Sequence, residues 1–278
     1  MDYTRKKVAI TGSTGFIGSS LAKELKSAGA MVLELHGDVR SRKTFEQLDH
    51  TFDYLFHFGA PSSQVLFNRQ PLLSGEVTIM GFLNALGECR RYGIKLIYPS
   101  TGLLSSDREN EYARCKKVCE DMAVGSDALG IRIFGTYGPG ESHKRDYASV
   151  PYLFAREIAN GRSPVIFGDG KQSRDFIYID DTVAGIMTLA EKCNEPTIDL
   201  GSGMPVTFEW LVETINHKYS HERKEPVFID KPQGYVNETE ADLTKTRPLF
   251  MGTVGIEEGL KRTFASIKRE HNWLLDDE

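Results

Sequence analysis

A tyrosine and a lysine four positions apart could carry proton-transfer chemistry in this chain. Tyr112 and Lys116 lie in a stretch typical of an amphipathic helix, where residues four apart share one face. The phenol of tyrosine is a poor base at neutral pH because its reference pKa is about 10. A nearby ammonium group stabilises the phenolate and lowers that pKa. Ser100 and Thr101 end an apolar run that predicts a strand, so a hydroxyl there would face the ligand edge of a sheet, although Ser-Thr at a strand end is also a common turn element.

A glycine-rich segment between an apolar run and an amphipathic stretch could hold phosphate groups. Residues 11–18 read TGSTGFIG, with glycines at positions 12, 15 and 18. Gly12 permits a tight turn, Gly15 lets the backbone approach a pyrophosphate, and Gly18 lets the helix pack close to the strand. A glycine triplet by itself is a weak signal that fits a mere turn equally well. In a strand–turn–helix context, however, this spacing predicts a dinucleotide site.

The turn at residues 37–40 follows the second predicted strand. Asp38 there could accept a hydrogen bond from an adenine amino group, or it could belong to a plain surface turn. The acidic residue that usually binds the ribose hydroxyls at the end of this strand is not evident. His36 lies near that position, with Glu34 two residues earlier. His36 and Arg40 could instead receive the 2′-phosphate of NADP.

The elements that would position these residues alternate along the first two hundred positions. Short apolar runs predict strands at residues 8–10, 31–33, 54–58, 96–98 and 131–134, and amphipathic stretches predict helices at 17–27, 75–92 and 111–123. This alternation predicts an α/β fold with a parallel sheet that binds ligands at the carboxyl ends of its strands. A further strand is expected at 176–179, and Asp180, Asp181 and Thr182 could cap the helix after it.

The composition sets limits on the class of protein. The 278 residues include 34 lysines and arginines against 39 aspartates and glutamates, a net charge of -5, which gives no general attraction to nucleic acid or an anionic membrane. With no run of about 18 apolar residues and no leader-like N-terminus, we expect a cytoplasmic protein. Cys115 and Cys119 could share a metal ion, but we expect packing residues and no metal site.

Together these motifs resemble the extended short-chain dehydrogenases, specifically the NAD-dependent epimerase/dehydratase branch that acts on nucleotide sugars. The matching segments are TGSTGFIG at 11–18, GDVR at 37–40, YARCK at 112–116, IRIFGTYGPG at 131–140 and FGDGKQSRDFIYIDD at 167–181. The resemblance implies a Rossmann-type doubly wound parallel sheet with a smaller C-terminal substrate lobe. We expect the dinucleotide-binding domain at residues 1–138 plus about 175–200, and the substrate lobe at 139–174 plus 201–278.

The resemblance also implies roles for individual residues. Tyr112 would exchange a proton with a sugar hydroxyl, while Lys116 would hydrogen-bond the nicotinamide ribose and depress the Tyr112 pKa. Thr101, with Ser100 as the alternate, would orient the sugar oxygen. Arg174 would contact the substrate's diphosphate, unless it forms a surface ion pair with Asp175 or Asp169. The other expected site residues are Gly135 on the substrate side and, for NAD or NADP, Gly12, Thr14, Gly15, Phe16, Ile17, Gly18, His36, Asp38, Val39, Arg40, Phe58, Gly59 and Ala60.

Departures from the branch's pattern bear on the reaction. Gly102, rather than an Asp-Glu pair, follows Thr101, which disfavours a dehydratase. Only residues 102–111 separate Thr101 from Tyr112, a short segment that deoxysugar 4-ketoreductases share. Thr78 and Gly135 stand where asparagines are usual, and residues 233–235 replace the branch's pattern near the C-terminus.

We therefore expect a nucleotide-sugar epimerase that removes and returns hydride at the sugar C4 through a 4-keto intermediate. The alternative is an NADPH-dependent 4-ketosugar reductase. A non-catalytic dinucleotide-sensing regulator is a remote alternative, because such relatives typically lose the Tyr–Lys pair. A homodimer through helices at about 78–92 and 111–123 is also implied, and Phe82, Leu86, Val118 and Met122 fit either that interface or burial against the sheet.

Overall fold

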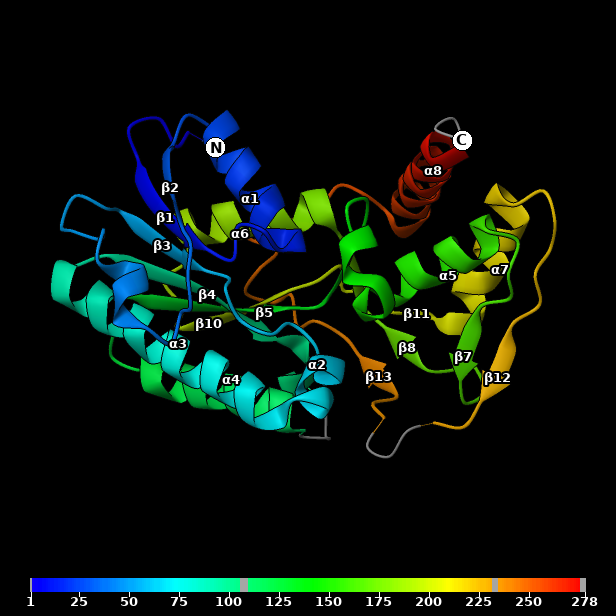
Figure 1. The fold of residues 1–278 in the computed structure, drawn as a ribbon, viewed down its shortest axis with the longest axis horizontal. Coiled ribbons are helices and arrows are strands. Elements are labelled where there is room, and N and C mark those ends of the chain that lie inside the picture. The colour runs from blue at the N-terminus through cyan, green and yellow to red at the C-terminus, as the bar shows by residue number, and fades with distance from the viewer. Residues whose placement is uncertain (1, 106–109, 232–234, 276–278) are drawn as a thin grey trace.

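A six-stranded parallel sheet forms the centre of the larger part of the molecule (Figure 1). The computed structural model describes residues 2–105, 110–231 and 235–275. The sheet order is β10-β5-β4-β3-β1-β2, and every adjacent pair is parallel. The strands are β1 (Lys7–Thr11), β2 (Met31–Leu35), β3 (Tyr54–His57), β4 (Lys95–Thr101), β5 (Ala128–Ile133) and β10 (Thr197–Leu200). The chain leaves β1 for β2 on one side and returns to β3 on the other, which opens a crevice between β1 and β3.

Helices cover both faces of this sheet (Figure 1). Helices α1 (Phe16–Ser27) and α6 (Ile179–Lys192) bury Leu21, Leu25 and Ile186 against one face. Helices α3 (Pro71–Tyr92) and α4 (Glu111–Ala123) bury Phe82 and Cys119 against the other. The apolar positions of these helices recur at helical spacing, so each helix presents one stripe to the strands. The fold is therefore the expected Rossmann-type doubly wound sheet.

The smaller part carries the remaining elements, which form three short sheets beside helices. β6 (Gly135–Tyr137) pairs with β9 (Phe176–Tyr178), β8 (Ser173–Arg174) lies between β11 (Val206–Thr207) and β13 (Glu238–Thr239), and β7 (Val165–Phe167) pairs with β12 (Val227–Ile229). The helices here are α5 (Val150–Ala159), α7 (Phe208–Tyr219) and α8 (Ile256–Leu275). The remaining elements of the chain are α2 (Gln64–Arg69) and the 3-10 turns η1 (Arg42–Phe45), η2 (Gly102–Ser105) and η3 (Ser142–Tyr147). On the basis of this arrangement, we propose the division into two domains that the sequence predicts.

One expectation about these elements needs correction, and one that left two alternatives open is divided between them. The residues expected to cap α6 do not do so: its N-cap is Tyr178 without a side-chain bond, and the Asp181 carboxylate instead accepts the backbone N–H groups of Thr253 and Val254. Asp181 is thus used to tie α6 to the segment before α8. The predicted interface residues also divide, because Phe82 and Leu86 are buried against the sheet while Val118 and Met122 are exposed. Within the described ranges, no helix combines the length and apolar character needed to cross a membrane.

Candidate active site

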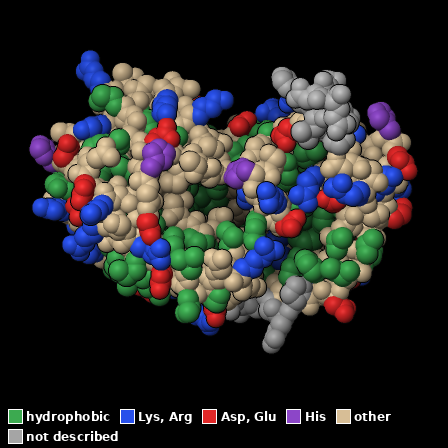
Figure 2. All heavy atoms as spheres, in the orientation of Figure 1, with side chains coloured by type: hydrophobic (Ala, Val, Ile, Leu, Met, Phe, Trp, Pro, Cys, Tyr) green, Lys and Arg blue, Asp and Glu red, His purple; other side chains and the backbone are tan. Residues whose placement is uncertain are grey.

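A cavity of about 510 Å³ lies at the carboxyl ends of β1, β3 and β4, where the two parts of the molecule meet. Figure 2 shows the hollow between them. Its wall brings together most of the residues expected from the sequence: Gly12, Gly15, Phe16, Ile17, Gly18, Phe58, Ala60, Ser100, Thr101, Tyr112, Lys116, Gly135 and Arg174. The sheet topology explains this meeting, because the ends of parallel strands share one edge.

The cofactor side of the cavity is a cradle that only glycines can form. Gly12 has φ +73°, and a Cβ there would lie 2.5 Å from the carbonyl carbon of Phe58. A Cβ on Gly18 would lie 2.0 Å from the Gly12 oxygen. The Thr11 hydroxyl joins the two loops, because its oxygen accepts the Gly59 N–H at 3.1 Å. Helix α1 begins directly behind this cradle with no side-chain cap, so its first N–H groups are available to a pyrophosphate. These residues fit a dinucleotide.

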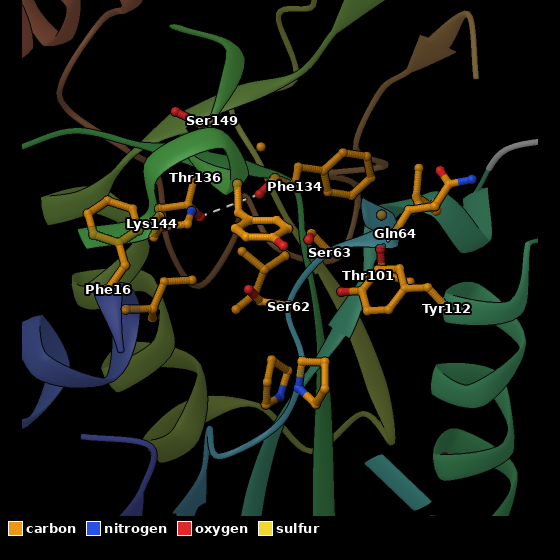
Figure 3. A pocket seen from close by; sticks show the side chains of 18 of the residues that line it. Phe16, Ser62, Ser63, Gln64, Thr101, Tyr112, Phe134, Thr136, Lys144 and Ser149 are labelled. Atoms are coloured by element: carbon orange, nitrogen blue, oxygen red, sulfur yellow. Dashed lines mark hydrogen bonds between the residues drawn. The ribbon is translucent and has the colours of Figure 1, made fainter. Parts of the chain in front are cut away.

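The reactive side chains come from α4 and from the end of β4. The Asn110 side chain accepts the Ala113 N–H at 2.8 Å, so α4 starts there and Tyr112 lies in its first turn. Tyr112 is 7% exposed, and its ring points toward the Thr101 hydroxyl (Figure 3). Lys116 follows one turn later, and its Nζ donates to the Pro99 oxygen at 2.9 Å. A proton donor or acceptor and an orienting hydroxyl therefore face one wall of the cavity.

The expected depression of the Tyr112 pKa is not what the structure shows. Burial raises the pKa of the Tyr112 phenol to about 12, and the Thr101 side chain opposes this only in part. The Lys116 Nζ lies 5.9 Å from the centre of the Tyr112 ring. Burial also lowers the pKa of Lys116. The low-dielectric surroundings thus disfavour charge on both groups.

The structure distinguishes Thr101 from its alternate Ser100. The Ser100 hydroxyl donates to Glu120 Oε1 at 2.6 Å. Glu120 is 5% exposed and also accepts from Arg132 at 2.9 and 2.8 Å. Ser100 is thereby held in a buried network on the side of α4. Thr101 is the hydroxyl that lies beside Tyr112.

At the substrate end, Arg174 is held among aromatic rings and backbone oxygens. Its guanidinium donates to the oxygens of Ser173 and Val236 and lies 5.7 Å and 5.5 Å from the ring centres of Phe208 and Tyr235. The alternative of an ion pair with Asp175 is wrong, because that carboxylate accepts from other groups, namely Ser202, Gly203 and Ala241.

Gly135 lines the same end of the cavity, where the family usually has an asparagine. A Cβ at this position would lie 2.6 Å from the Phe176 ring. That distance is shorter than side chains tolerate, so an asparagine has no room here without a shift of Phe176. The glycine is therefore a consequence of the aromatic packing around it.

The cavity also contains a cation that the sequence reasoning missed. Lys144 in η3 points in from the side opposite Tyr112, beside Phe16 (Figure 3). Its Nζ lies 2.9 Å from the fully buried carboxylate of Glu141. Lys116 and Arg174 are the other long cations, and no aspartate or glutamate occurs among the described lining residues. In the sequence, the polar run that follows residues 138–140 is the feature that could have pointed to Lys144.

Several expected cofactor residues lie outside the cavity wall, namely Thr14, His36, Asp38, Val39, Arg40 and Gly59. The Arg40 guanidinium binds the Asp38 carboxylate at 2.6 Å and the Glu76 carboxylate at 3.0 Å. Val39 is buried in the core beneath α3. Roles for these residues in adenosine binding therefore stay predictions. In the described part of the chain, no group of three or more potential metal ligands occurs, so Cys115 and Cys119 do not belong to one.

Comparisons with known proteins agree with this fold. The family model described as "NAD dependent epimerase/dehydratase family" matches residues 8–201. The UDP-glucuronic acid decarboxylase 1 of Danio rerio is 27% identical over 96% of this chain and 73% of its own length. The UDP-glucose 4-epimerase of Thermotoga maritima, solved with UDP-glucose, superposes with a TM-score of 0.85 at 25% identity, covering 95% of this chain and 99% of that one. The UDP-N-acetylglucosamine 4-epimerase of Methanobrevibacter ruminantium gives 0.84 at 26%, covering 96% and 99%.

Proposed function

Because the chain belongs to the NAD dependent epimerase/dehydratase family, we propose that it is an NAD(P)-dependent nucleotide-sugar epimerase that inverts the sugar C4. The observation that carries this proposal is the cavity itself. A glycine cradle for a dinucleotide, the Tyr112–Thr101 pair and three long cations open into one space, and no acidic side chain is present among the described lining residues. Two diphosphate-bearing ligands are the anions that such a cavity fits.

The chain's own residues would divide the work as follows. The Tyr112 side chain, as its phenolate, takes the proton of the C4 hydroxyl, and the phenol so formed later returns that proton, while Thr101 donates a hydrogen bond that holds the sugar oxygen in line. The bound nicotinamide supplies the reversible hydride acceptor. Lys116, buried one helical turn away and lining the same cavity, would hydrogen-bond the cofactor ribose. Arg174 would offer the substrate's diphosphate the N–H groups that its bonds to the Ser173 and Val236 oxygens leave over.

The second candidate is a 4-ketosugar reductase that uses NADPH. The short segment between Thr101 and Tyr112 favours it. The contacts of Arg40 argue against the reductase, because two carboxylates already bind this guanidinium. Of the two residues expected at a 2′-phosphate, only His36 remains. We therefore place the epimerase first.

A panel of UDP-, dTDP-, GDP- and CDP-sugars tests the proposal. Each sugar is incubated with purified protein and a catalytic amount of NAD, without reductant, and the C4 epimers are separated. We expect interconversion of one C4 pair. Stoichiometric consumption of NADPH with a 4-keto sugar, and no interconversion, would instead establish the reductase.

We also propose a homodimer through α3 and α4. Both helices expose apolar side chains on the side away from the sheet: Met80, Leu83, Val118 and Met122 are 36–46% exposed. A charge in a dimer interface is costly, so Met122→Glu should give a monomer in analytical ultracentrifugation. Met251→Glu, at a 69% exposed methionine elsewhere, is the matched control and should sediment like the unchanged protein. A Met122→Glu protein that stays dimeric would exclude this face.

A further inference from the structure

The short helix α2 touches the catalytic tyrosine and the substrate lobe at once. Phe67 is 1% exposed, and its ring meets the Tyr112 ring edge-on with centres 5.2 Å apart. Two residues later, the Arg69 guanidinium lies 4.8 Å from the centre of the Tyr147 ring. Tyr147 belongs to η3 and lines the cavity, as do the residues that lead into α2. The helix therefore connects the two walls of the active site.

We propose that α2 is a clasp in which Phe67 positions the Tyr112 phenol and the Arg69–Tyr147 contact retains the bound dinucleotide. This inference rests on the proposed function. An epimerase must return hydride to the sugar that supplied it, so loss of the reduced cofactor in mid-reaction would end the cycle. A contact that joins the two walls of the cavity slows that loss without touching the reacting atoms.

The clasp is anchored independently of any ligand. The Ser63 hydroxyl accepts the Leu66 N–H at 3.4 Å and caps the start of α2. At its end, the Gln70 N–H donates to the Leu66 oxygen, and α3 begins at the next residue, Pro71. Helix α2 also packs against α4, which carries Tyr112. The position of Phe67 is consequently set by the framework rather than by the substrate.

Arg69 is suited to a reversible contact. No carboxylate among the described residues forms an ion pair with it, and its ring contact joins segments that are distant in the chain. A cation over an aromatic face is attracted by the ring's quadrupole, modestly so when water has access. The Arg69–Tyr147 contact is therefore strong enough to hold the two walls of the cavity together and weak enough to break when the cofactor exchanges.

The retention half of the proposal is tested by cofactor release. Protein loaded with NADH is mixed with excess NAD, and the decay of bound-NADH fluorescence gives the dissociation rate. Arg69→Ala should raise that rate about 2- to 5-fold, the factor that loss of a partly exposed cation–π contact implies. Arg69→Lys should raise it less. Arg91→Ala removes a similar contact within α3, where Arg91 lies 5.3 Å from the Tyr92 ring centre, and should leave the rate unchanged.

A rate for Arg69→Ala equal to that of the unchanged protein would overturn the retention role. This readout does not depend on turnover. If the sugar panel shows no C4 interconversion, the proposed function fails while the release experiment still decides whether the clasp exists.

The positioning half is tested with Phe67→Leu, which keeps an apolar side chain and is expected to fold. Because the Tyr112 ring loses its edge contact, we expect kcat to fall on the order of tenfold with little change in the sugar's KM. Burial is what raises the Tyr112 pKa, so greater exposure should lower that pKa and move the rising limb of the pH–rate profile, along which the phenolate forms, to lower pH. An unchanged kcat and an unchanged pH profile in Phe67→Leu would show that the ring only fills space.

Discussion

Replacing Tyr112 by phenylalanine removes a single oxygen atom from the site. The ring is 7% exposed and packs edge-on against Phe67, and phenylalanine retains that contact. The hydroxyl interacts with the Thr101 side chain. The substitution therefore separates the acid–base role of the phenol from its contribution to packing.

The two effects differ in size. A general acid or base contributes about 10²- to 10⁴-fold to turnover, which is roughly 2.7–5.5 kcal/mol at 1.36 kcal/mol per factor of ten. A neutral hydrogen bond contributes about 1 kcal/mol to stability, which in a protein of this size is a change of roughly 2–4 °C in Tm. We expect Tyr112→Phe to lose 10²- to 10⁴-fold in kcat while Tm falls by a few degrees at most.

The assay is C4 interconversion of the sugar selected by the panel, with circular dichroism melting on the same samples. Tyr98→Phe is the matched control. Tyr98 is also buried, at 2% exposure, and its hydroxyl has no hydrogen-bond partner among the described residues. Its loss should leave activity unchanged. Turnover by a well-folded Tyr112→Phe protein within a few-fold of the unchanged protein would refute the assignment of Tyr112 as the proton-transfer group.

The other predictions concern the ligand sites and acid stability. Arg174→Ala should raise the nucleotide sugar's KM and leave cofactor affinity intact, with Arg174→Lys rescuing only in part; unchanged sugar binding in calorimetry would make the arginine structural. Gly18→Ala should abolish cofactor binding, because its Cβ would lie 2.0 Å from a backbone oxygen, whereas Gly87→Ala, with open space on α3, should bind normally and gain up to about 1 kcal/mol of stability. Burial lowers the pKa of His57 to about 3 in the folded protein, whereas the same side chain has its ordinary pKa of about 6.5 in the unfolded chain. Between these two pH values the unfolded chain therefore binds the proton more readily than the folded protein. Stability should therefore fall by about 2 kcal/mol between pH 7.5 and pH 5 in urea titrations. The His57→Asn protein should not lose this stability. If its stability depends on pH as strongly as that of the unchanged protein, His57 is not the cause.

Local patterns in the sequence were sufficient for the framework. The glycine cradle, the strands and the start of α4 at residue 111 follow from short-range spacing, because turns, helix faces and alternating runs are properties of neighbouring residues. The Tyr112–Lys116 pair was found in the same way. The sequence also indicated that strand ends would meet at one edge, since parallel strands joined by helices leave no other arrangement.

Packing between distant segments decided the rest. Glu120 and Arg132 draw the Ser100 hydroxyl away and leave Thr101 beside Tyr112, a choice that two adjacent hydroxyls in a sequence do not reveal. Burial, rather than the nearby lysine, sets the direction of the Tyr112 pKa, and burial depends on which helix covers the ring. The position of Lys144 in the cavity likewise depends on packing between segments that are distant in the chain.

The contact of α2 with both Tyr112 and Tyr147 is the clearest case of this kind. Its short span, residues 64–69, carries no motif that predicts a partner. The relevant neighbours lie far along the chain: packing within the larger part brings α4 to α2, and the docking of the two lobes brings η3 within reach. The sequence by itself determined which chemical groups the protein has and which local elements carry them. Their separations, their exposure to water and therefore their protonation were determined by the tertiary structure, because these quantities depend on long-range packing.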